Sequence, residues 1–355
     1  MIIPSPDSTK HVRNSSIELY RILAAFAVLI VHFNGWFVGG LPEIFDFNNI
    51  SLFRSCQVGI QASTCICVNM FILISGYFSI KLKVQSVMRL CLKLLCIFLP
   101  FYIVYAIILR SFSVTGLVYN FFVVSRAGYF IQCYMMLMFL SPILNSFVEI
   151  YKKRIIAYCL ILVLLEFWFG CIMSITLGLE DNLNINRGYS VVHFVAIYLI
   201  GRCLFLYQDD LRTIKSYYWI IAYTGCTIVI CAMYLLGVRF AFDYSNPVVI
   251  ISSICSFLPF IYMDFYNNII NWVAGSALSI YIISSGTQIV PLLMKVDEYV
   301  LSNYEYCEYL GLIAGLIFVV FSFCVLYDKI CGILINPFMR LLLDKSRGLR
   351  LTLYM

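Results

Sequence analysis

Hydrophobic residues gather in ten long, almost unbroken segments along the whole chain. The segments lie at about 17–37, 58–80, 88–109, 128–148, 154–178, 190–206, 216–237, 247–264, 272–294 and 309–335. Each has roughly the 20 apolar residues that an α-helix needs to cross the hydrocarbon core of a bilayer. Strands of a membrane barrel would alternate apolar and polar residues, and these segments do not. The pattern therefore predicts an all-α, polytopic integral membrane protein with about ten transmembrane helices.

Lysine and arginine residues are distributed unevenly between the loops that connect these segments. With the N-terminus inside, the inner loops and helix ends receive about three times as many Lys and Arg residues as the outer loops, which is the bias of cytoplasmic loops. The outer loop at 295–308 instead carries the acidic residues Asp297, Glu298, Glu305 and Glu308. We therefore expect both termini to be cytoplasmic in a multi-pass protein of the cytoplasmic (inner) cell membrane.

The chain is expected to form one transmembrane domain over residues 1–335, including a cytoplasmic leader at 1–16. The first apolar segment is long and has charged residues at its start, so we expect it to stay in place as a signal anchor. Residues 336–355 are expected to form a basic cytoplasmic tail. Its cations suit a short interfacial helix on anionic lipid of the inner leaflet, and they are Arg340, Lys345, Arg347 and Arg350.

The composition agrees with a lipid environment and narrows the candidate chemistry. Hydrophobic residues make up 63% of the 355 residues and charged residues 12%, against about 45–50% and 25% in a soluble domain. A water-soluble globule is thereby excluded. Only three histidines are present, His11, His32 and His193, so a base that works near neutral pH has few candidates. The 15 cysteines are scattered through the predicted helices, a pattern that predicts neither a disulfide framework nor a metal site.

Three ionisable residues lie on one face of the first predicted helix. Arg21 follows Glu18 by three residues, and His32 follows Arg21 by eleven, which is three turns plus about 20°. The rise of about 16 Å between Arg21 and His32 carries the imidazole to near the middle of the bilayer. A titratable group at that depth is costly unless it faces protein or a water-filled cavity. The pattern favours a functional site over the alternative, in which His32 makes a structural hydrogen bond and Arg21 anchors the helix at the interface.

Two groups of residues near the inner face are candidates for binding. Ser75 precedes Gly76 near the end of the second predicted helix, where small residues permit close backbone approach and the hydroxyl can face a polar cavity. Lys83, Arg89 and Lys93 lead into the third predicted helix. Their positive charges suit the phosphates of a cytosolic cofactor, and they also suit lipid phosphate.

Polar and aromatic residues elsewhere are candidates for binding a substrate. Glu166 lies in the middle of a predicted helix, where a carboxylate should be protonated or paired. It can shape a binding site, pair with His193, or make an ordinary buried hydrogen bond. His193 is expected near the outer interface, in contact with substrate or in plain interfacial packing. Tyr129 and Tyr134 can stack against sugar rings, although aromatic belts occupy the same depth for reasons of lipid contact alone.

Several motifs occur in a family-like order. Arg21 and His32 are separated by ten residues in a helix of the form Glu-Leu-X-Arg followed by His-Phe. Other similar stretches are a Ser-Gly-aromatic sequence at 70–77 and a basic helix that ends in proline at 89–100. A helix with an aromatic start and a Ser-Pro end follows at 128–145, and a hydrophobic-Gly step at 198–202. In these features the chain resembles the acyltransferase-3 family of membrane acyltransferases, which includes O-acetyltransferases of bacterial surface polysaccharides.

This resemblance implies a membrane-bound O-acyltransferase. The donor would be a cytosolic acyl-CoA, first of all acetyl-CoA, held without a metal through Lys83, Arg89 and Lys93. His32 would act as a general base or as a transient acyl carrier, in a catalytic site completed by Arg21, Glu18 and Ser75. The acceptor would be a hydroxyl of a cell-surface polysaccharide or its lipid-linked precursor, in contact with Tyr129, Tyr134, Glu166 and His193. Membrane lipid and this glycan are the expected partners, with no nucleic acid, and the oligomeric state is open.

The chain also departs from the family pattern. Many members have a Tyr-Leu-X-His sequence late in the chain, whereas residues 279–285 here read Ser-Ile-Tyr-Ile-Ile-Ser-Ser, so that histidine is missing. The main alternative function is a transporter or flippase of lipid-linked sugars. Transporters of that kind often carry inverted repeats or paired helices broken by Gly or Pro, and the sequence contains no evident repeat of that kind.

Overall fold

The computed structural model describes residues 14–37, 40–42, 45, 52–108, 110, 112–122, 128–181, 184–286, 290–303 and 306–353. Over these residues the regular structure is helical, without strands. The α-helices are α1 (Ser15–His32), α2 (Leu52–Thr64), α3 (Cys67–Tyr77), α4 (Val84–Ile108), α5 (Val114–Phe122), α6 (Gly128–Ile150), α7 (Ile155–Glu166), α8 (Val191–Leu206), α9 (Gln208–Leu211), α10 (Ser216–Leu235), α11 (Pro247–Ile261), α12 (Asn268–Ala274), α13 (Ala277–Ser284), α14 (Val290–Asn303) and α15 (Tyr306–Leu353). Short π or 3-10 segments are η1 (Phe33–Phe37), η3 (Lys152–Arg154), η4 (Phe167–Thr176) and η5 (Asn186–Gly188).

Within the described residues, seven helical stretches are long and apolar enough to cross a membrane. They are Ser15–Gly35, Phe53–Tyr77, Val84–Ile108, Gly128–Ile150, Lys152–Thr176, Ser216–Leu235 and Glu308–Arg340. Three shorter apolar helices lie at Val191–Leu206, Pro247–Ile261 and Asn268–Ser284. Each of these stretches overlaps one of the ten apolar segments of the sequence. The predicted all-α, polytopic membrane fold is confirmed, and the count of ten crossings and the cytoplasmic side of both termini stay predictions.

Two helices lie where the sequence analysis expected loops. The short helix α5 lies between the third and fourth apolar segments, and α14 covers most of the expected outer loop at 295–308. In α14, Leu293 and Val300 are buried and are seven residues, or about two turns, apart. The helix therefore presents one apolar face, which a search for continuous apolar runs does not detect.

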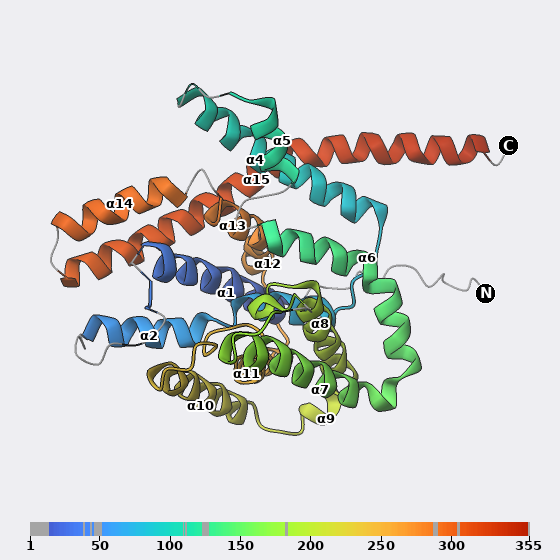
Figure 1. Ribbon diagram of the computed structural model, residues 1–355. Coiled ribbons are helices and arrows are strands. Elements are labelled where there is room, and N and C mark those ends of the chain that lie inside the picture. Colours follow the sequence, from blue (N-terminus) through green and yellow to red (C-terminus); the bar gives the residue numbers. More distant parts are fainter. Residues whose placement is uncertain are drawn as a thin grey trace.

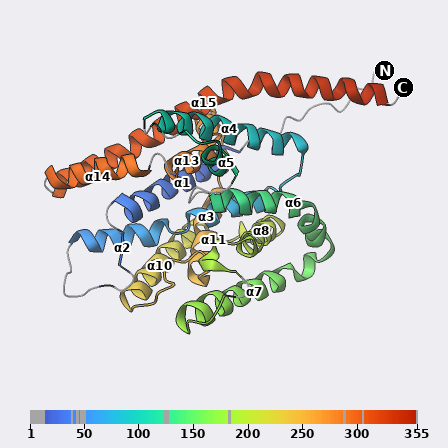
Figure 2. The same cartoon turned by 45° about the horizontal axis from the view of Figure 1, so that its top comes forward.

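The long helix α15 passes through Pro337 without a break. The expected tail at 336–355 is therefore helical and continuous with the last apolar segment, because a proline removes one backbone hydrogen bond and does not have to end a helix. In both views the C-terminal part of α15 extends away from the other helices (Figures 1 and 2). Its position on the inner leaflet stays a prediction.

Helix α1 begins inside the residues expected to form the leader. The Asn14 side chain accepts a hydrogen bond from the Ser16 backbone N–H at 2.9 Å, which caps the helix. Ser15 and Ser16 are buried, and the Ser16 hydroxyl donates to the Phe260 carbonyl at 2.6 Å. These two serines therefore belong to the packed domain, and residues 1–13 lie outside the described part of the chain.

The first helix occupies the middle of the bundle (Figure 1). It contacts α2, α3 and α11 on one side and α12, α13 and α15 on the other. Ala24 and Ala25 are fully buried in these contacts, and their small side chains allow neighbouring helices to approach closely. The middle of α1 is thus packed against neighbouring helices, whereas Arg21 and His32 stay partly exposed.

Helices α3 and α8 cross at two glycines. A Cβ added to Gly201 would lie 2.5 Å from the Leu73 carbonyl oxygen and 2.9 Å from the Gly76 Cα, so neither glycine position has room for a larger residue. This close backbone approach is the role predicted for Gly76. It holds α3, which carries Ser75, firmly against α8.

Candidate active site

Two cavities lie along α1, and we name each after the residue of α1 that lines it. The Arg21 cavity has a volume of about 360 Å³, and its polar lining residues are Arg21, Ser75, Lys93, Tyr134 and Tyr281. The His32 cavity has a volume of about 420 Å³, and its polar lining residues include His32, Gln61, Tyr129, Asn186, Tyr189, Tyr244 and Tyr281. Tyr281 lines both cavities. The face of α1 that was predicted from helical phase therefore runs beside two neighbouring spaces.

In the Arg21 cavity, the arginine is paired with the residue one turn before it. The Arg21 guanidinium donates to Glu18 Oε2 at 2.7 Å. Glu18 is buried, whereas the Arg21 side chain keeps 27% of its surface exposed. The Glu18 carboxylate, one helical turn earlier, thus orients the guanidinium, while part of the Arg21 side chain still faces the cavity.

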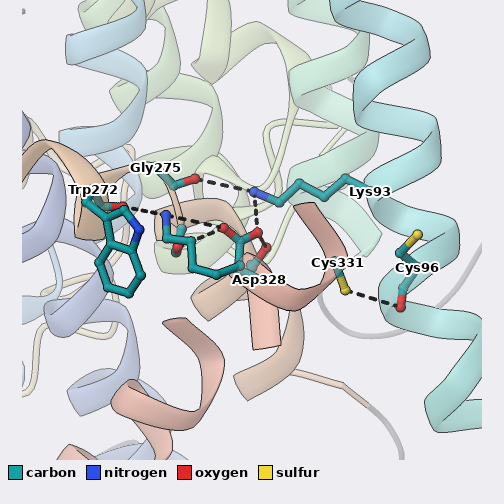
Figure 3. A network of polar contacts seen from close by, with 9 residues as sticks. Lys93, Cys96, Trp272, Gly275, Asp328 and Cys331 are labelled. Carbon is teal, nitrogen blue, oxygen red and sulfur yellow. Dashed lines mark hydrogen bonds and ion pairs between the residues drawn. The ribbon is translucent and has the colours of Figure 1, made fainter. Parts of the chain in front are cut away.

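Lys93 reaches the same cavity from α4 and is held by α15 and by the turn between α12 and α13 (Figure 3). Its ammonium lies 2.8 Å from Asp328 Oδ1 on α15 and donates to the Gly275 carbonyl at 3.4 Å. Asp328 also accepts hydrogen bonds from Ser276 and Ser279, at 2.7 and 2.5 Å. Lys93 therefore ties α4 to the wall formed by α12, α13 and α15, and much of its charge is neutralised where it stands.

The imidazole of His32 faces the other cavity with a serine behind it. Its Nδ1 lies 3.2 Å from Ser284 Oγ on α13 and is hydrogen-bonded to it. Ser284 Oγ also donates to the Tyr281 carbonyl at 3.2 Å. The rings of His32 and Tyr281 are 6.1 Å apart. Helix α13 therefore fixes both the orientation of the histidine and the tyrosine shared by the two cavities.

Aromatic and amide side chains build the opposite wall of the His32 cavity. The ring centroids of Tyr129 and Tyr189 are 4.6 Å apart, and those of Tyr189 and Tyr244 are 5.1 Å apart. Asn186 and Gln61 add amide groups to the lining. Aromatic rings and amides together suit a ligand with both C–H faces and hydroxyl groups.

Comparison with family models identifies the chain. A model described as an acyltransferase domain, that of the acyltransferase-3 family, matches residues 14–331. The chain belongs to the acyltransferase-3 family. Comparison with the curated proteins and with the solved structures gives no match. The match covers both cavities and all the predicted site residues, and it supports a multi-pass membrane acyltransferase.

Lys83 and Arg89 of this acyltransferase lie outside the lining of the Arg21 cavity. Both side chains are exposed, and neither forms an ion pair with another described residue. Arg89 precedes Lys93 by one helical turn on α4, a rise of about 6 Å. The structure thus brings Lys93 together with Arg21 and Ser75, and it leaves Lys83 and Arg89 on the surface before them.

Ser75 and Tyr134 lie together in the Arg21 cavity, with their hydroxyl oxygens 3.5 Å apart. Ser75 donates to the Phe71 carbonyl one turn earlier at 2.9 Å. Tyr129 lies instead in the His32 cavity. The two tyrosines predicted to bind the same substrate therefore line different cavities.

Glu166 and His193 form a buried pair away from both cavity linings. His193 Nδ1 lies 2.8 Å from Glu166 Oε2, and His193 Nε2 lies 2.8 Å from Asn69 Oδ1. The exposed fractions are 1% for Glu166 and 0% for His193 and Asn69. The pairing is one of the alternatives considered for Glu166, but the burial of both residues leaves no surface for direct contact with a substrate.

Several residues of the site cannot be recognised from the sequence, among them Tyr281, Ser284 and Asp328. Tyr281 and Ser284 occur in the stretch noted for its missing histidine, and Ser284 stands three residues after the tyrosine, as that histidine would. Asp328 lies inside the last apolar segment, where an ionisable residue is a signal of function or pairing in its own right. Only the packing of distant helices reveals which residue each of them contacts.

Proposed function

We propose that this protein transfers an acyl group from cytosolic acyl-CoA to a hydroxyl group of a cell-surface polysaccharide or its lipid-linked precursor. The observation that carries the proposal is the position of His32 in a cavity that shares Tyr281 with a second cavity lined by Arg21 and Lys93. One space can hold the donor and the other the acceptor, with Tyr281 between them and the His32 ring 6.1 Å from that tyrosine. Acetyl is the group we expect, since it is the smallest acyl group of common coenzyme A donors.

The donor is assigned to the Arg21 cavity. Arg21 lines it with part of its side chain exposed, Lys93 lines it while paired with Asp328, and the exposed Lys83 and Arg89 extend the basic surface along the start of α4. Phosphate groups pair well with such cations. The excess of Lys and Arg in the predicted inner loops supports a cytosolic position for this side of the protein, where acyl-CoA is available. Ser75 and Tyr134 then line the path of the acyl chain.

The acceptor is assigned to the His32 cavity. Its tyrosine rings can stack on the faces of a sugar ring, and Asn186 and Gln61 can hydrogen-bond to hydroxyl groups. A hydroxyl that enters this cavity meets the imidazole of His32. The partner is therefore a glycan with a free hydroxyl group.

His32 acts as the general base. Ser284 donates its single proton to the Tyr281 carbonyl, so it accepts from Nδ1–H of His32, and this tautomer carries the lone pair on Nε2. Nε2 takes the proton of the acceptor hydroxyl while its oxygen attacks the thioester carbonyl carbon. The carbon–sulfur bond then breaks, and the coenzyme A thiolate leaves and takes the proton from the imidazolium. Arg21, oriented by Glu18, holds the donor in place during this transfer.

The test is acyl transfer in isolated membranes. Membranes that contain the protein or its His32→Ala variant are incubated with radiolabelled acetyl-CoA, and label is measured on lipid-linked and polymeric glycan. We expect label that depends on His32. Equal label with a normally inserted His32→Ala protein would refute the assignment, and movement of an unmodified sugar lipid without any label would favour the flippase alternative.

A further inference from the structure

Part of the wall of the His32 cavity comes from two loops that contact each other. Tyr244 belongs to the loop between α10 and α11, and Asn186 and Tyr189 belong to the loop before α8. The Tyr244 N–H donates to the Arg187 carbonyl at 3.1 Å. Gly188 has φ +91°, and a Cβ added to it would lie 2.7 Å from the Tyr244 Cβ. These contacts fix the two loops relative to each other, so the position of this part of the wall depends on what holds Tyr244.

A chain of buried polar groups reaches this wall from inside the bundle. Asn69 Nδ2 donates to the Tyr244 carbonyl at 3.2 Å. Because the amide nitrogen is used there, the amide oxygen faces His193, and Nε2–H of His193 donates to it at 2.8 Å. On the other side of the imidazole, one proton is shared between Nδ1 and Glu166 Oε2 at 2.8 Å. Glu166 on α7, His193 on α8, Asn69 on α3 and the Tyr244 carbonyl of the wall are therefore connected by one continuous chain of hydrogen bonds.

The burial of this chain makes it a rigid support. Its three side chains are at most 1% exposed, and a hydrogen bond in such surroundings is costly to break because the freed groups find no water. The crossing of α3 and α8 at Gly76 and Gly201 holds Asn69 and His193 on neighbouring backbones. The side chains of Glu166, His193 and Asn69 line neither cavity, and the Tyr244 carbonyl is where the chain meets the wall.

We propose that Glu166, His193 and Asn69 are positioning residues that set the acceptor-binding wall of the His32 cavity through the Tyr244 carbonyl. They do not touch substrate, and they act on acceptor affinity rather than on the chemical step. The assignment of this wall to the acceptor rests on the proposed function. The hydrogen-bonded link from these residues to the Tyr244 loop does not depend on the proposed function.

The first experiment separates acceptor binding from catalysis. The full-length protein in lipid nanodiscs is assayed with acetyl-CoA and with envelope glycan extracted from the source cells, quantified as hexose. We expect Glu166→Leu to raise the apparent KM for glycan about tenfold, the effect of losing about one buried hydrogen bond. The KM for acetyl-CoA and kcat should stay within about twofold, because the Arg21 cavity and His32 are untouched.

The conservative variant Glu166→Gln is the decisive partner of Glu166→Leu. A glutamine N–H can donate to Nδ1 and leave Nε2–H on Asn69, so the chain persists without charge. Glu166→Gln should therefore restore the glycan KM to within about twofold of wild type. Tyr198→Phe is the matched control, since Tyr198 is also fully buried on α8 but donates to Asn145 at 2.8 Å instead. The proposal is overturned if Gln is as harmful as Leu, or if the control gives the same rise.

A second experiment tests the link without enzyme activity. Hydrogen exchange of residues 236–246 is measured for wild type, Glu166→Gln and Asn69→Asp. Asn69→Asp can still accept from His193 but loses the N–H that donates to Tyr244, so we expect exchange at Tyr244 to rise about tenfold in this variant alone. Unchanged exchange would overturn the proposal even if Glu166→Leu fails to fold. A wild-type protein that shows the expected exchange pattern yet acylates no glycan would refute the proposed function and not the link.

Discussion

His32 and His193 are residues of the same type in two different surroundings. His32 is partly exposed to a cavity and has a serine hydroxyl behind Nδ1. His193 is fully buried, and both of its ring nitrogens face acceptor oxygens, one from Glu166 and one from Asn69. The difference shows that depth in the membrane does not make a histidine catalytic. A base needs a nitrogen that a substrate can reach, whereas an imidazole enclosed by acceptors is a structural connector.

The largest expected effect comes from replacing the two histidines by glutamine. His32→Gln should lower kcat at least about a hundredfold, the usual contribution of a general base. His193→Gln should leave kcat at saturating glycan within about threefold, because it acts on the wall and not on the proton transfer. Both rates are measured at equal amounts of folded protein, judged by thermal melting. Equal losses of kcat in the two variants would show that His32 and His193 do not differ in role.

A smaller effect is expected from the serine that orients the catalytic candidate. Ser284→Ala should lower kcat about tenfold with little change in either KM, because the imidazole loses a hydrogen bond of ordinary strength. Ser284→Thr keeps the hydroxyl and should recover most of the rate. Ser253→Ala is the control, since this buried serine donates only to the Ile250 carbonyl of its own helix. A rate for Ser284→Ala no lower than that of the control would show that His32 does not depend on α13.

The two basic residues of α4 should differ in the same way as the two histidines. Arg89 is exposed, so Arg89→Ala should raise the KM for acetyl-CoA about tenfold without a change in melting temperature. Lys93→Met instead removes the closer cation of the buried Asp328 and leaves only Lys329, whose Nζ is 3.9 Å from Oδ2, so it should cost about 3 kcal/mol of stability.

A double variant checks this interpretation of Lys93. Adding Asp328→Asn to Lys93→Met should recover most of the lost stability, because the poorly paired charge is gone. The measurement is a double-mutant cycle of thermal or denaturant unfolding. If Lys93→Met raised the KM for acetyl-CoA at unchanged stability, the lysine would be a phosphate ligand and not a tie between helices.

The smallest effect concerns the pH dependence of stability. Burial raises the pKa of Asp243 to about 7, although the Arg187 guanidinium 4.0 Å away opposes this rise. An unfolded aspartate has a pKa of about 3.9. Between these values the folded protein keeps a proton that the unfolded chain has lost, so stability should fall as pH rises from about 4 to about 7 and then level off. Asp243→Asn should flatten this part of the melting-temperature profile, whereas Glu298→Gln, an exposed control, should not.

Local sequence rules predicted most of the fold and one face of the site. Apolar runs located the long helices, and helical phase placed Glu18, Arg21 and His32 on a common face because these rules depend only on near neighbours along the chain. The helix α14 was not predicted, because an amphipathic helix has no long apolar run. The continuation of α15 through Pro337 was not predicted, because a proline that a helix tolerates looks the same in the sequence as one that ends it.

Contacts between distant helices could not be predicted in the same way. The partners Ser284 of His32, Asp328 of Lys93 and Asn69 of His193 are separated from them by more than a hundred residues. Each pairing depends on how the helices cross, for which the sequence offered only a hint at Gly76. Residues that can carry chemistry are therefore recognisable in the sequence, whereas their roles depend on contact partners that the sequence does not identify.

The most direct test of the account is acyl transfer across a sealed membrane. The protein is reconstituted into proteoliposomes with one orientation, radiolabelled acetyl-CoA is supplied on the side of the Arg21 cavity, and glycan is enclosed on the opposite side. We expect label on the enclosed glycan with wild-type protein and a loss of at least about a hundredfold with His32→Ala. Label that forms equally well with His32→Ala would contradict this expectation.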